Sequence, residues 1–368
     1  MPAISFVNVT KKFGKVAALD GLSFEVKDGQ YVCVLGPTGS GKTTLLKLMA
    51  GLLKPDEGTI YFDGKVLNNV APQSRNAVYV PQQYALFPHL TVLQNVAFGP
   101  LARGKPPSAA LEIASKTLDL VRLTWRAQAL PSELSGGMQQ RVALARGLAS
   151  GAGLLLLDEP LGALDARLRL DLRHKLRDIV KQSGFTAVHV THDQDEAMSV
   201  GDEIMVLRNG GIQDYGPPRR VYRKPANIFV THMIGGASFL EGIVDTTVGE
   251  TALIGLRGGL TVQAPSKNLT LTAPVILALR KERIRIARDH LEMDNAFKGE
   301  IRDVRFLGNS KEYLIRISNG DVIASRRFAE GEGGEFKVGD EVLVGFLEGD
   351  AMVFEYPAHG LRQELEIS

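Results

Sequence analysis

The chain has 368 residues, a length that predicts two or three domains. Its 43 Lys and Arg residues oppose 41 Asp and Glu residues, and the formal charge of +2 excludes a global electrostatic attraction to nucleic acid or to an anionic membrane. The single cysteine, Cys33, excludes a disulfide framework and fits a reducing cytosol. We expect no membrane crossing by this chain alone, because it lacks a long uninterrupted apolar run and Met1–Ser5 lacks the features of a secretory signal.

Residues 1 to about 235 have the pattern of an α/β domain. Apolar and polar residues alternate in Ile4–Val9 and Leu22–Val26, which predicts an antiparallel sheet with one face in water. The pattern from Ser108 to Leu148 is helical, so we expect a helical subdomain at about residues 90–150. Short apolar runs bounded by turns predict buried parallel strands at Tyr31–Leu35, Ala77–Val80, Leu154–Leu157 and Thr186–Val190.

A domain boundary is predicted at Gly236. Three prolines lie between Pro217 and Pro225, and the helical pattern of Ala226–Ile234 is followed by the helix-stop pair Gly235-Gly236. Beyond that point, period-two alternation and frequent turns predict an all-β domain over residues 237–368, of the small oligonucleotide/oligosaccharide-binding (OB) barrel type. The clearest of these strands are Val275–Leu279, Tyr313–Ile317 and Val342–Phe346.

The segment from Gly36 to Thr43 matches the G-x-x-x-x-G-K-[ST] phosphate-loop pattern, between a predicted strand and a predicted helix. Its glycines allow successive backbone N–H groups to face a polyphosphate at a helix N-terminus. Lys42 is expected to reach the β- and γ-phosphates, and Thr43 is expected to offer its hydroxyl to Mg²⁺. The candidate ATP-binding residues here are Gly36, Pro37, Thr38, Gly39, Ser40, Gly41, Lys42, Thr43 and Thr44.

Two adjacent carboxylates end the apolar run Leu154–Leu157. Because successive side chains of a strand point to opposite faces, Asp158 and Glu159 are expected to serve different partners. Asp158 is the candidate ligand of the metal bound by Thr43. Glu159 is the candidate general base that activates the attacking water.

The segment Leu134–Arg141 contains Ser-Gly-Gly and is followed by a helical pattern. Together with the phosphate loop and Leu-Leu-Asp-Glu-Pro, in this order and spacing, it resembles the ATP-binding cassette (ABC) ATPases. The resemblance implies a P-loop NTPase fold with a RecA-like core, an antiparallel β subdomain and a helical subdomain. In that family the segment contacts the γ-phosphate held by the other subunit, a role that falls here on Ser135, Gly136 and Gly137. The family usually has Gln where this chain has Met138.

The resemblance assigns four further positions. Phe13 matches the aromatic residue on which adenine stacks. Gln82 matches the glutamine that reaches Mg²⁺ and the water, although Gln83 beside it is an alternative. Asp165 lies in the match to the loop that crosses to the other subunit, and His192 matches the histidine that contacts the γ-phosphate. The resemblance thus implies hydrolysis of ATP with Mg²⁺ by a head-to-tail homodimer, with Glu159, His192, Gln82 and Lys42 as catalytic residues.

The second domain narrows the resemblance. Ala278–Ile286, Gly299–Gly308 and Gly339–Val342 resemble the TOBE repeats of importer ATPases. The implied function is the ATP-hydrolysing subunit of a binding-protein-dependent importer, peripheral at the cytoplasmic face of the cell membrane. The implied partners are a second copy, integral-membrane permease subunits and, indirectly, an external solute-binding protein, with no nucleic acid.

Alternatives remain at this point. A soluble ABC ATPase acting on ribosomes or nucleic acid usually needs a second cassette, a coiled-coil insertion or a basic arm, and the sequence contains none of these. An exporter ATPase would normally be fused to membrane spans or lack the appended barrel. A nucleotide sensor without activity would be expected to have lost Glu159 or His192. The transported solute, whether sugar, polyamine, iron or inorganic anion, is not encoded in these motifs.

Overall fold

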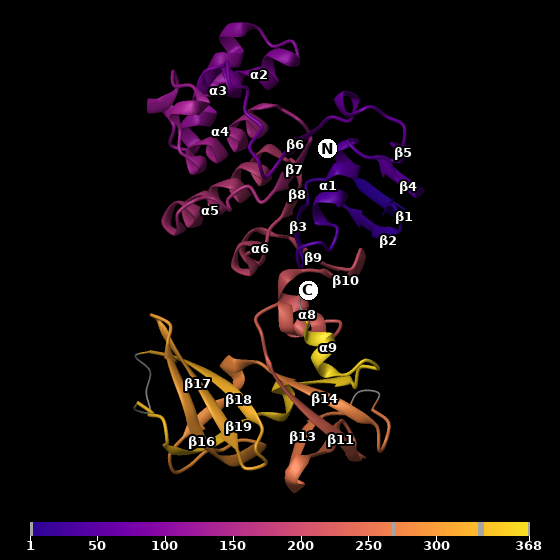
Figure 1. Ribbon diagram of the computed structural model, residues 1–368, viewed down its shortest axis with the longest axis vertical. Helices are drawn as coiled ribbons and strands as arrows, with labels where there is room; N and C mark the ends of the chain where they lie inside the picture. The colour runs from indigo at the N-terminus through magenta and orange to yellow at the C-terminus, as the bar shows by residue number, and fades with distance from the viewer. Residues whose placement is uncertain (1–2, 267–268, 330–334, 367–368) are drawn as a thin grey trace. The chain divides into compact units, whose positions relative to one another are not determined.

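The computed structural model describes residues 3–266, 269–329 and 335–366 (Figure 1). Contacts divide the chain into two compact units between Val221 and Tyr222. The division lies ahead of the predicted boundary at Gly236, because Arg280 of the second unit holds the intervening segment. Its guanidinium donates to the carbonyl oxygens of Tyr222 at 2.9 Å and of Thr231 at 2.8 Å.

The first unit begins with a four-stranded antiparallel sheet in the order β2-β1-β4-β5. The predicted alternation appears in β1, where Ile4 and Phe6 are buried and face the core. One hydrophobic cluster joins these residues to Leu45 of helix α1 and to Val32 of the second sheet. The strands are β1 (Ile4–Phe13), β2 (Val16–Val26), β4 (Glu57–Phe62) and β5 (Lys65–Val66).

A six-stranded sheet in the order β10-β9-β3-β8-β7-β6 forms the centre of the first unit. All neighbouring pairs run parallel except β9 and β10. Every residue of β3, β7 and β8 is buried, which explains their continuous apolar runs and confirms the predicted parallel strands. The strands are β3 (Tyr31–Leu35), β6 (Ala77–Val80), β7 (Leu154–Asp158), β8 (Thr186–Val190), β9 (Glu203–Arg208) and β10 (Gly211–Gly216).

The first unit also contains α-helices, which connect many of its strands (Figure 1). Helices α2, α3 and α4 share a separate hydrophobic cluster that includes Val96, Leu118 and Val142, and they form the expected helical subdomain. None of the described helices is both long and apolar enough to cross a membrane. The helices are α1 (Lys42–Ala50), α2 (Val92–Ala102), α3 (Pro107–Leu120), α4 (Gly136–Ala149), α5 (Ala166–Ser183) and α6 (Gln194–Val200), with short 3-10 turns at Pro72–Ser74, Thr124–Arg126 and Pro131–Glu133. Helix α7 (Pro218–Arg223) contains the division between the two units.

The second unit is an all-β domain with two short helices. Its strands form two five-stranded antiparallel sheets, β13-β12-β11-β14-β20 and β15-β19-β16-β17-β18, an arrangement consistent with the expected OB-like barrel. The elements are α8 (Ile228–Met233), β11 (Ser238–Val248), β12 (Thr251–Leu256), β13 (Thr261–Pro265), β14 (Pro274–Leu279), β15 (Arg285–Ala287), β16 (Asn295–Phe306), β17 (Ser310–Ile317), β18 (Val322–Phe328), β19 (Glu341–Phe346), β20 (Ala351–Glu355) and α9 (Leu361–Leu365), with 3-10 turns at Arg257–Gly259, Lys281–Arg283 and Glu348–Asp350.

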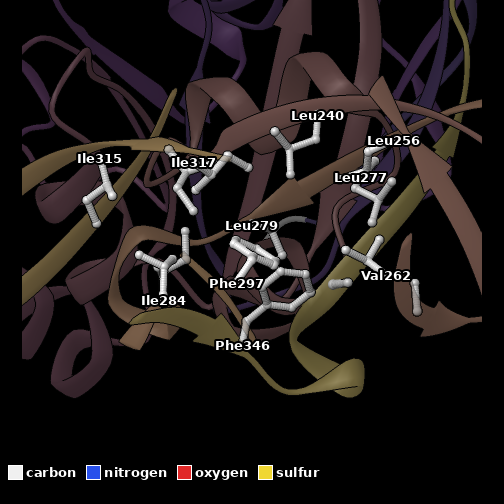
Figure 2. Packing of buried hydrophobic residues seen from close by; sticks show 14 of the residues in the cluster. Leu240, Leu256, Val262, Leu277, Leu279, Ile284, Phe297, Ile315, Ile317 and Phe346 are labelled. Carbon is white, nitrogen blue, oxygen red and sulfur yellow. The ribbon is translucent and has the colours of Figure 1, made fainter. Parts of the chain in front are cut away.

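The two sheets of the second unit share one core. Figure 2 shows Leu240 and Leu277 of the first sheet in the same cluster as Phe297 and Phe346 of the second. The rings of Phe297 and Phe346 meet edge to face with their centroids 6.1 Å apart, a favoured aromatic geometry. Burial of this cluster is the main stabilisation of the all-β unit.

Candidate nucleotide-binding and catalytic site

The phosphate loop connects the end of β3 to the start of α1, as predicted, and lies tightly against neighbouring backbone. A Cβ atom on Gly36 would lie 2.4 Å from the carbonyl oxygen of Leu207. Gly41 precedes α1 with φ of +103°, and a Cβ atom there would lie 2.3 Å from the carbonyl oxygen of Ala18. Only glycine fits these two positions, so the loop keeps a shape in which its N–H groups and the start of α1 are available to an anion.

Two side chains of the loop fit a polyphosphate. The hydroxyl of Ser40 is buried and has no hydrogen-bond partner among the residues that the structure describes. Lys42 donates from Nζ to the carbonyl oxygens of Gly36 at 2.8 Å and Pro37 at 2.7 Å. Burial lowers the pKa of Lys42, while the charges of Glu159 and Asp158 oppose that shift. Phosphate oxygens would supply the acceptors that Ser40 lacks and that Lys42 now finds in the loop itself.

Thr43 and Asp158 form an oxygen pair suited to Mg²⁺. The Thr43 hydroxyl donates to Asp158 Oδ2 at 3.1 Å, and the Tyr79 hydroxyl donates to the same oxygen at 2.9 Å. Burial, with the nearby Asp158 charge, raises the pKa of Tyr79, so its hydroxyl stays a donor. Within residues 3–266, 269–329 and 335–366, no group of three or more His, Cys, Asp or Glu side chains has the arrangement of a metal site. The Thr43 hydroxyl and the Asp158 carboxylate are oxygen donors of the kind that Mg²⁺ prefers, and this chemistry fits a cation that also binds phosphate and water.

Glu159 is held by side chains from two other loops. Its Oε2 accepts a hydrogen bond from Gln82 Nε2 at 3.0 Å, and its Oε1 lies 2.8 Å from His192 Nε2. The structure thus brings the predicted Gln82, Glu159 and His192 together, whereas the adjacent Asp158 contacts Thr43. A hollow of about 440 Å³ opens here, and it is lined by Glu159, Gly162, Arg169, Thr191, His192, Asp193 and Glu196.

The main chain of Glu159 is unusual. Its φ of +49° lies in the left-handed region, which non-glycine residues seldom adopt. Its N–H donates to the carbonyl oxygen of Val190 at 2.9 Å, so the turn is tied to the end of β8. Strained backbone of this kind persists where the surroundings fix it, and it clusters at active sites.

The loop that carries Gln82 is also strained and is fixed by one arginine. Tyr84 and Ala85 have φ values of +60° and +47°. Arg146 donates to the carbonyl oxygen of Tyr84 at 3.1 Å and to that of Ala85 at 2.9 Å, and its guanidinium lies 5.3 Å from the centroid of the Phe87 ring. Gln82, and not Gln83, is the residue of this loop whose amide reaches Glu159.

Other predicted residues lie outside this hydrogen-bonded group. Phe13 ends β1 with 51% of its surface exposed, and Lys11 Nζ lies 5.7 Å from its ring centroid.

Ser135 precedes α4, and its hydroxyl accepts from the Met138 N–H at 3.4 Å. The signature glycines Gly136 and Gly137 begin α4. The Asp165 carboxylate caps α5 by accepting from the Leu168 N–H at 2.9 Å. Thr38 of the phosphate loop is exposed, and Thr44, just after the loop, is half-buried in α1.

Three contacting residues were not singled out from the sequence. Tyr79 reaches Asp158 from β6, and Arg146 fixes the loop after Gln82. Gln140 of α4 donates to the carbonyl oxygen of Glu159 at 2.8 Å. Each makes its contact across the fold, so no local spacing in the chain marks it.

Comparison with known proteins identifies the families of both parts of the chain. The ABC transporter family matches residues 19–162, and the TOBE domain family matches residues 277–354. A spermidine/putrescine import ATP-binding protein of Rubrobacter xylanophilus is 39% identical over 93% of this chain and 91% of its own length. An Fe(3+) ions import ATP-binding protein of Brucella abortus is 43% identical over 86% of this chain and 89% of its own length.

A solved structure supports the fold of the first unit. It is a dimeric ATP-binding cassette in a post-hydrolysis state with ADP and Pi bound, with a TM-score of 0.55 and 34% sequence identity. The match covers 59% of this chain and 99% of that cassette. The chain therefore belongs to the ABC transporter family, as an importer ATPase whose cassette is followed by a TOBE domain.

Proposed function

We propose that two copies of this chain close head to tail around two Mg-ATP molecules and, by hydrolysing them, drive membrane permease subunits at the cytoplasmic face of the membrane. The observation that carries the proposal is that Gln82, Glu159 and His192, from three separate loops, meet beside the Thr43 and Asp158 pair. Ser135 lies outside that group, as expected if it serves the ATP bound by the other copy.

The residues of one copy divide the work of phosphoryl transfer to water. Lys42 and the N–H groups of the phosphate loop bind the phosphates, while Thr43, Asp158 and Gln82 would hold Mg²⁺. A cation held there would supply positive charge against the phosphates. Glu159 takes a proton from the attacking water as that oxygen bonds to the γ-phosphorus and the bond to ADP breaks. His192 and Gln82 orient the Glu159 carboxylate.

The second copy would complete each site. Ser135 caps α4, and Gly136 and Gly137 start this helix of 14 residues, whose N-terminus favours an anion. Asp165 starts α5 and would lie at the boundary between copies. The exposed ring of Phe13 would stack on adenine, which requires only an accessible aromatic face. The dimeric state of the solved cassette supports this arrangement.

The nucleotide site and the all-β sheets lie in separate parts of the chain, and we divide the chain into two domains accordingly. We assign residues 1–236 to the nucleotide-binding domain and residues 237–368 to a domain that assists dimerisation or regulation.

The two relatives are named for different solutes, spermidine/putrescine and Fe(3+) ions, at similar identity to this chain. The solute is therefore assigned to the permease and an external solute-binding protein rather than to the cassette.

The Glu159→Gln variant tests the proposal. It keeps the size of the side chain but removes the base, so ATP should still bind while turnover falls at least about 100-fold. Dimers should then accumulate with Mg-ATP in size-exclusion chromatography. Glu112→Gln, at an exposed carboxylate of α3, is the control and should hydrolyse ATP like the parent chain. Unchanged hydrolysis in Glu159→Gln would remove Glu159 from its role.

A further inference from the structure

We propose that Gln140 is a positioning residue that ties helix α4 to the main chain of Glu159 and thereby sets the position of the base. The inference deepens the proposed function, because it rests on Glu159 as the general base. Gln140 lies five residues beyond Ser135, on the helix that the signature segment begins. The hydrogen bonds that the structure describes for the Gln140 side chain go to backbone groups and not to the phosphate loop or to the Glu159 carboxylate. Gln140 therefore acts on the base through the main chain of Glu159.

Both halves of the Gln140 amide are used. Its Nε2 donates to the carbonyl oxygen of Glu159 at 2.8 Å, and its Oε1 accepts from the N–H of Ala163 at 2.9 Å. The residue is only 4% exposed, so water cannot easily replace either partner. One buried amide therefore connects α4 to both ends of the turn that follows Glu159.

The hydrogen bond from Gln140 reaches Glu159, a residue with strained backbone angles. The left-handed φ of Glu159 is fixed on one side by the bond from its N–H to Val190. On the other side its carbonyl oxygen accepts from Gln140 and, at a longer 3.2 Å, from the Gly162 N–H. Because the peptide groups on both sides of the Glu159 Cα are hydrogen-bonded, the residue cannot rotate toward ordinary backbone angles without breaking these bonds. Gln140 is thus the side chain that holds the peptide group following Glu159, next to the Cα from which the carboxylate projects.

Helix α4 makes a second connection further along. Arg146 lies six residues beyond Gln140 and holds the carbonyl oxygens of Tyr84 and Ala85 in the loop that carries Gln82. Helix α4, which Ser135 caps, therefore holds the main chain of Glu159 through Gln140 and the loop that carries Gln82 through Arg146. When Ser135 engages ATP bound by the other copy, the same helix fixes the base of its own copy, which would link the two sites.

Substitutions at Gln140 separate this role from simple packing. Gln140→Met keeps a similar volume but removes the partner of the Ala163 N–H and leaves the Glu159 carbonyl oxygen with only the longer bond from the Gly162 N–H. Gln140→Glu can still accept from Ala163, but the ionised carboxylate cannot donate to the Glu159 carbonyl oxygen, whereas the protonated form can. The neighbouring Gln139 is a matched control, since its amide also donates to backbone carbonyl oxygens, those of Pro131 and Leu134, away from Glu159.

The experiment compares the full-length parent chain with Gln140→Met, Gln140→Glu, Gln139→Met, Gln139→Glu and Glu159→Gln. For each, kcat and KM for Mg-ATP, the affinity for ATP and the melting temperature are measured, and kcat is followed from pH 8 to pH 5.5. Ratios to the parent at each pH remove the pH dependence of ATP hydrolysis that the variants at Gln140 and Gln139 share with the parent.

We expect Gln140→Met to lower kcat at least about tenfold while KM stays within about twofold, because positioning and not binding is lost. The kcat of Gln140→Glu, relative to the parent, should rise as pH falls and the introduced carboxyl gains its proton. The inference is overturned by parent-like kcat in Gln140→Met, by an equal loss in Gln139→Met, or by a Gln140→Glu ratio that does not change with pH.

The other variants distinguish failure of this inference from unfolding of Gln140→Met and from failure of the proposed role of Glu159. If Gln140→Met unfolds, the pH dependence of Gln140→Glu against Gln139→Glu decides the question. If Glu159→Gln hydrolyses ATP normally, the proposed role of Glu159 fails and the inference fails with it. If Glu159→Gln is inactive but Gln140→Met behaves like the parent, only the inference fails.

Discussion

The Nε2 atom of His192 lies 2.8 Å from the Oε1 atom of Glu159, and the two residues follow neighbouring parallel strands, β8 and β7. The other carboxylate oxygen of Glu159 accepts from Gln82. Two loops therefore orient one carboxylate, at the edge of the sheet where the carboxyl ends of the strands meet.

Removing the histidine should lower turnover more than binding. In His192→Ala, Gln82 remains as the side-chain donor to the Glu159 carboxylate, and we expect kcat to fall about 100-fold with KM for ATP changed only a few-fold. His192→Gln should recover part of the loss, because its amide N–H can still donate to Oε1. Steady-state ATPase assays check this, with His174→Ala on the exposed side of α5 as control. Equal activity of His192→Ala and the control would contradict the orientation described above.

Gly41→Ala should abolish ATP binding because the added methyl group forces the phosphate loop out of its present conformation. The new methyl group would lie 2.3 Å from the Ala18 carbonyl oxygen, and the left-handed backbone costs about 1–2 kcal/mol in addition. Gly64→Ala is the matched control, since Gly64 has φ of +74° with no heavy atom within 4 Å. Both variants should lose stability in urea unfolding, but only Gly41→Ala should lose ATP binding. Retained nucleotide affinity in Gly41→Ala would show that the loop tolerates a side chain.

The sequence predicted those parts of the site that are encoded by contiguous residues. The phosphate loop, the Asp158-Glu159 pair and the signature segment each combine a motif with a strand end or helix start, so their local geometry follows from the chain itself. The parallel strands were recognisable because burial on both faces gives continuous apolar runs.

The remaining contacts depend on the order of the strands and on helix packing. Tyr79 meets Asp158 because β6 pairs with β7, although these strands are far apart in the chain. Gln140 and Arg146 lie on the same helix but reach different loops, and helical periodicity alone does not identify their partners. Alternation likewise marked the strands of the second unit but not their division into two sheets, where β20 pairs with β14.

Arg280→Met should weaken the second unit selectively. Arg280 is 4% exposed, and its guanidinium donates to the carbonyl oxygens of Tyr222, Thr231, Ile234 and Gly236. Leaving these buried acceptors unpaired should cost about 3 kcal/mol or more, because each hydrogen bond to a charged donor is worth about 1.5–3 kcal/mol. Calorimetry should record a lower melting temperature for the second unit. Arg283→Met, at a half-exposed arginine, is the control, and equal melting temperatures for both variants would refute this account.

His189 should make the first unit less stable in mild acid. The imidazole is fully buried in β8, with Nδ1 2.9 Å from the Tyr31 hydroxyl oxygen and Nε2 3.4 Å from Glu196 Oε1. Burial lowers the pKa of His189; the charges of Glu196 and Asp158 oppose the shift, and that of Arg173 reinforces it. Because the unfolded chain protonates near pH 6.5 and the folded chain only at lower pH, the unfolded state binds more protons in between.

The free energy of unfolding should therefore fall as pH drops below about 6.5, by at most about 1.4 kcal/mol per pH unit from this single group. Urea unfolding at pH 7.5, 6.5 and 5.5 measures the slope. His189→Gln should flatten it, since the amide does not titrate in this range, whereas His290→Gln, with a side chain that is 79% exposed, should keep the parent slope. If the parent chain and His189→Gln lose stability equally on acidification, the acid sensitivity arises from other groups.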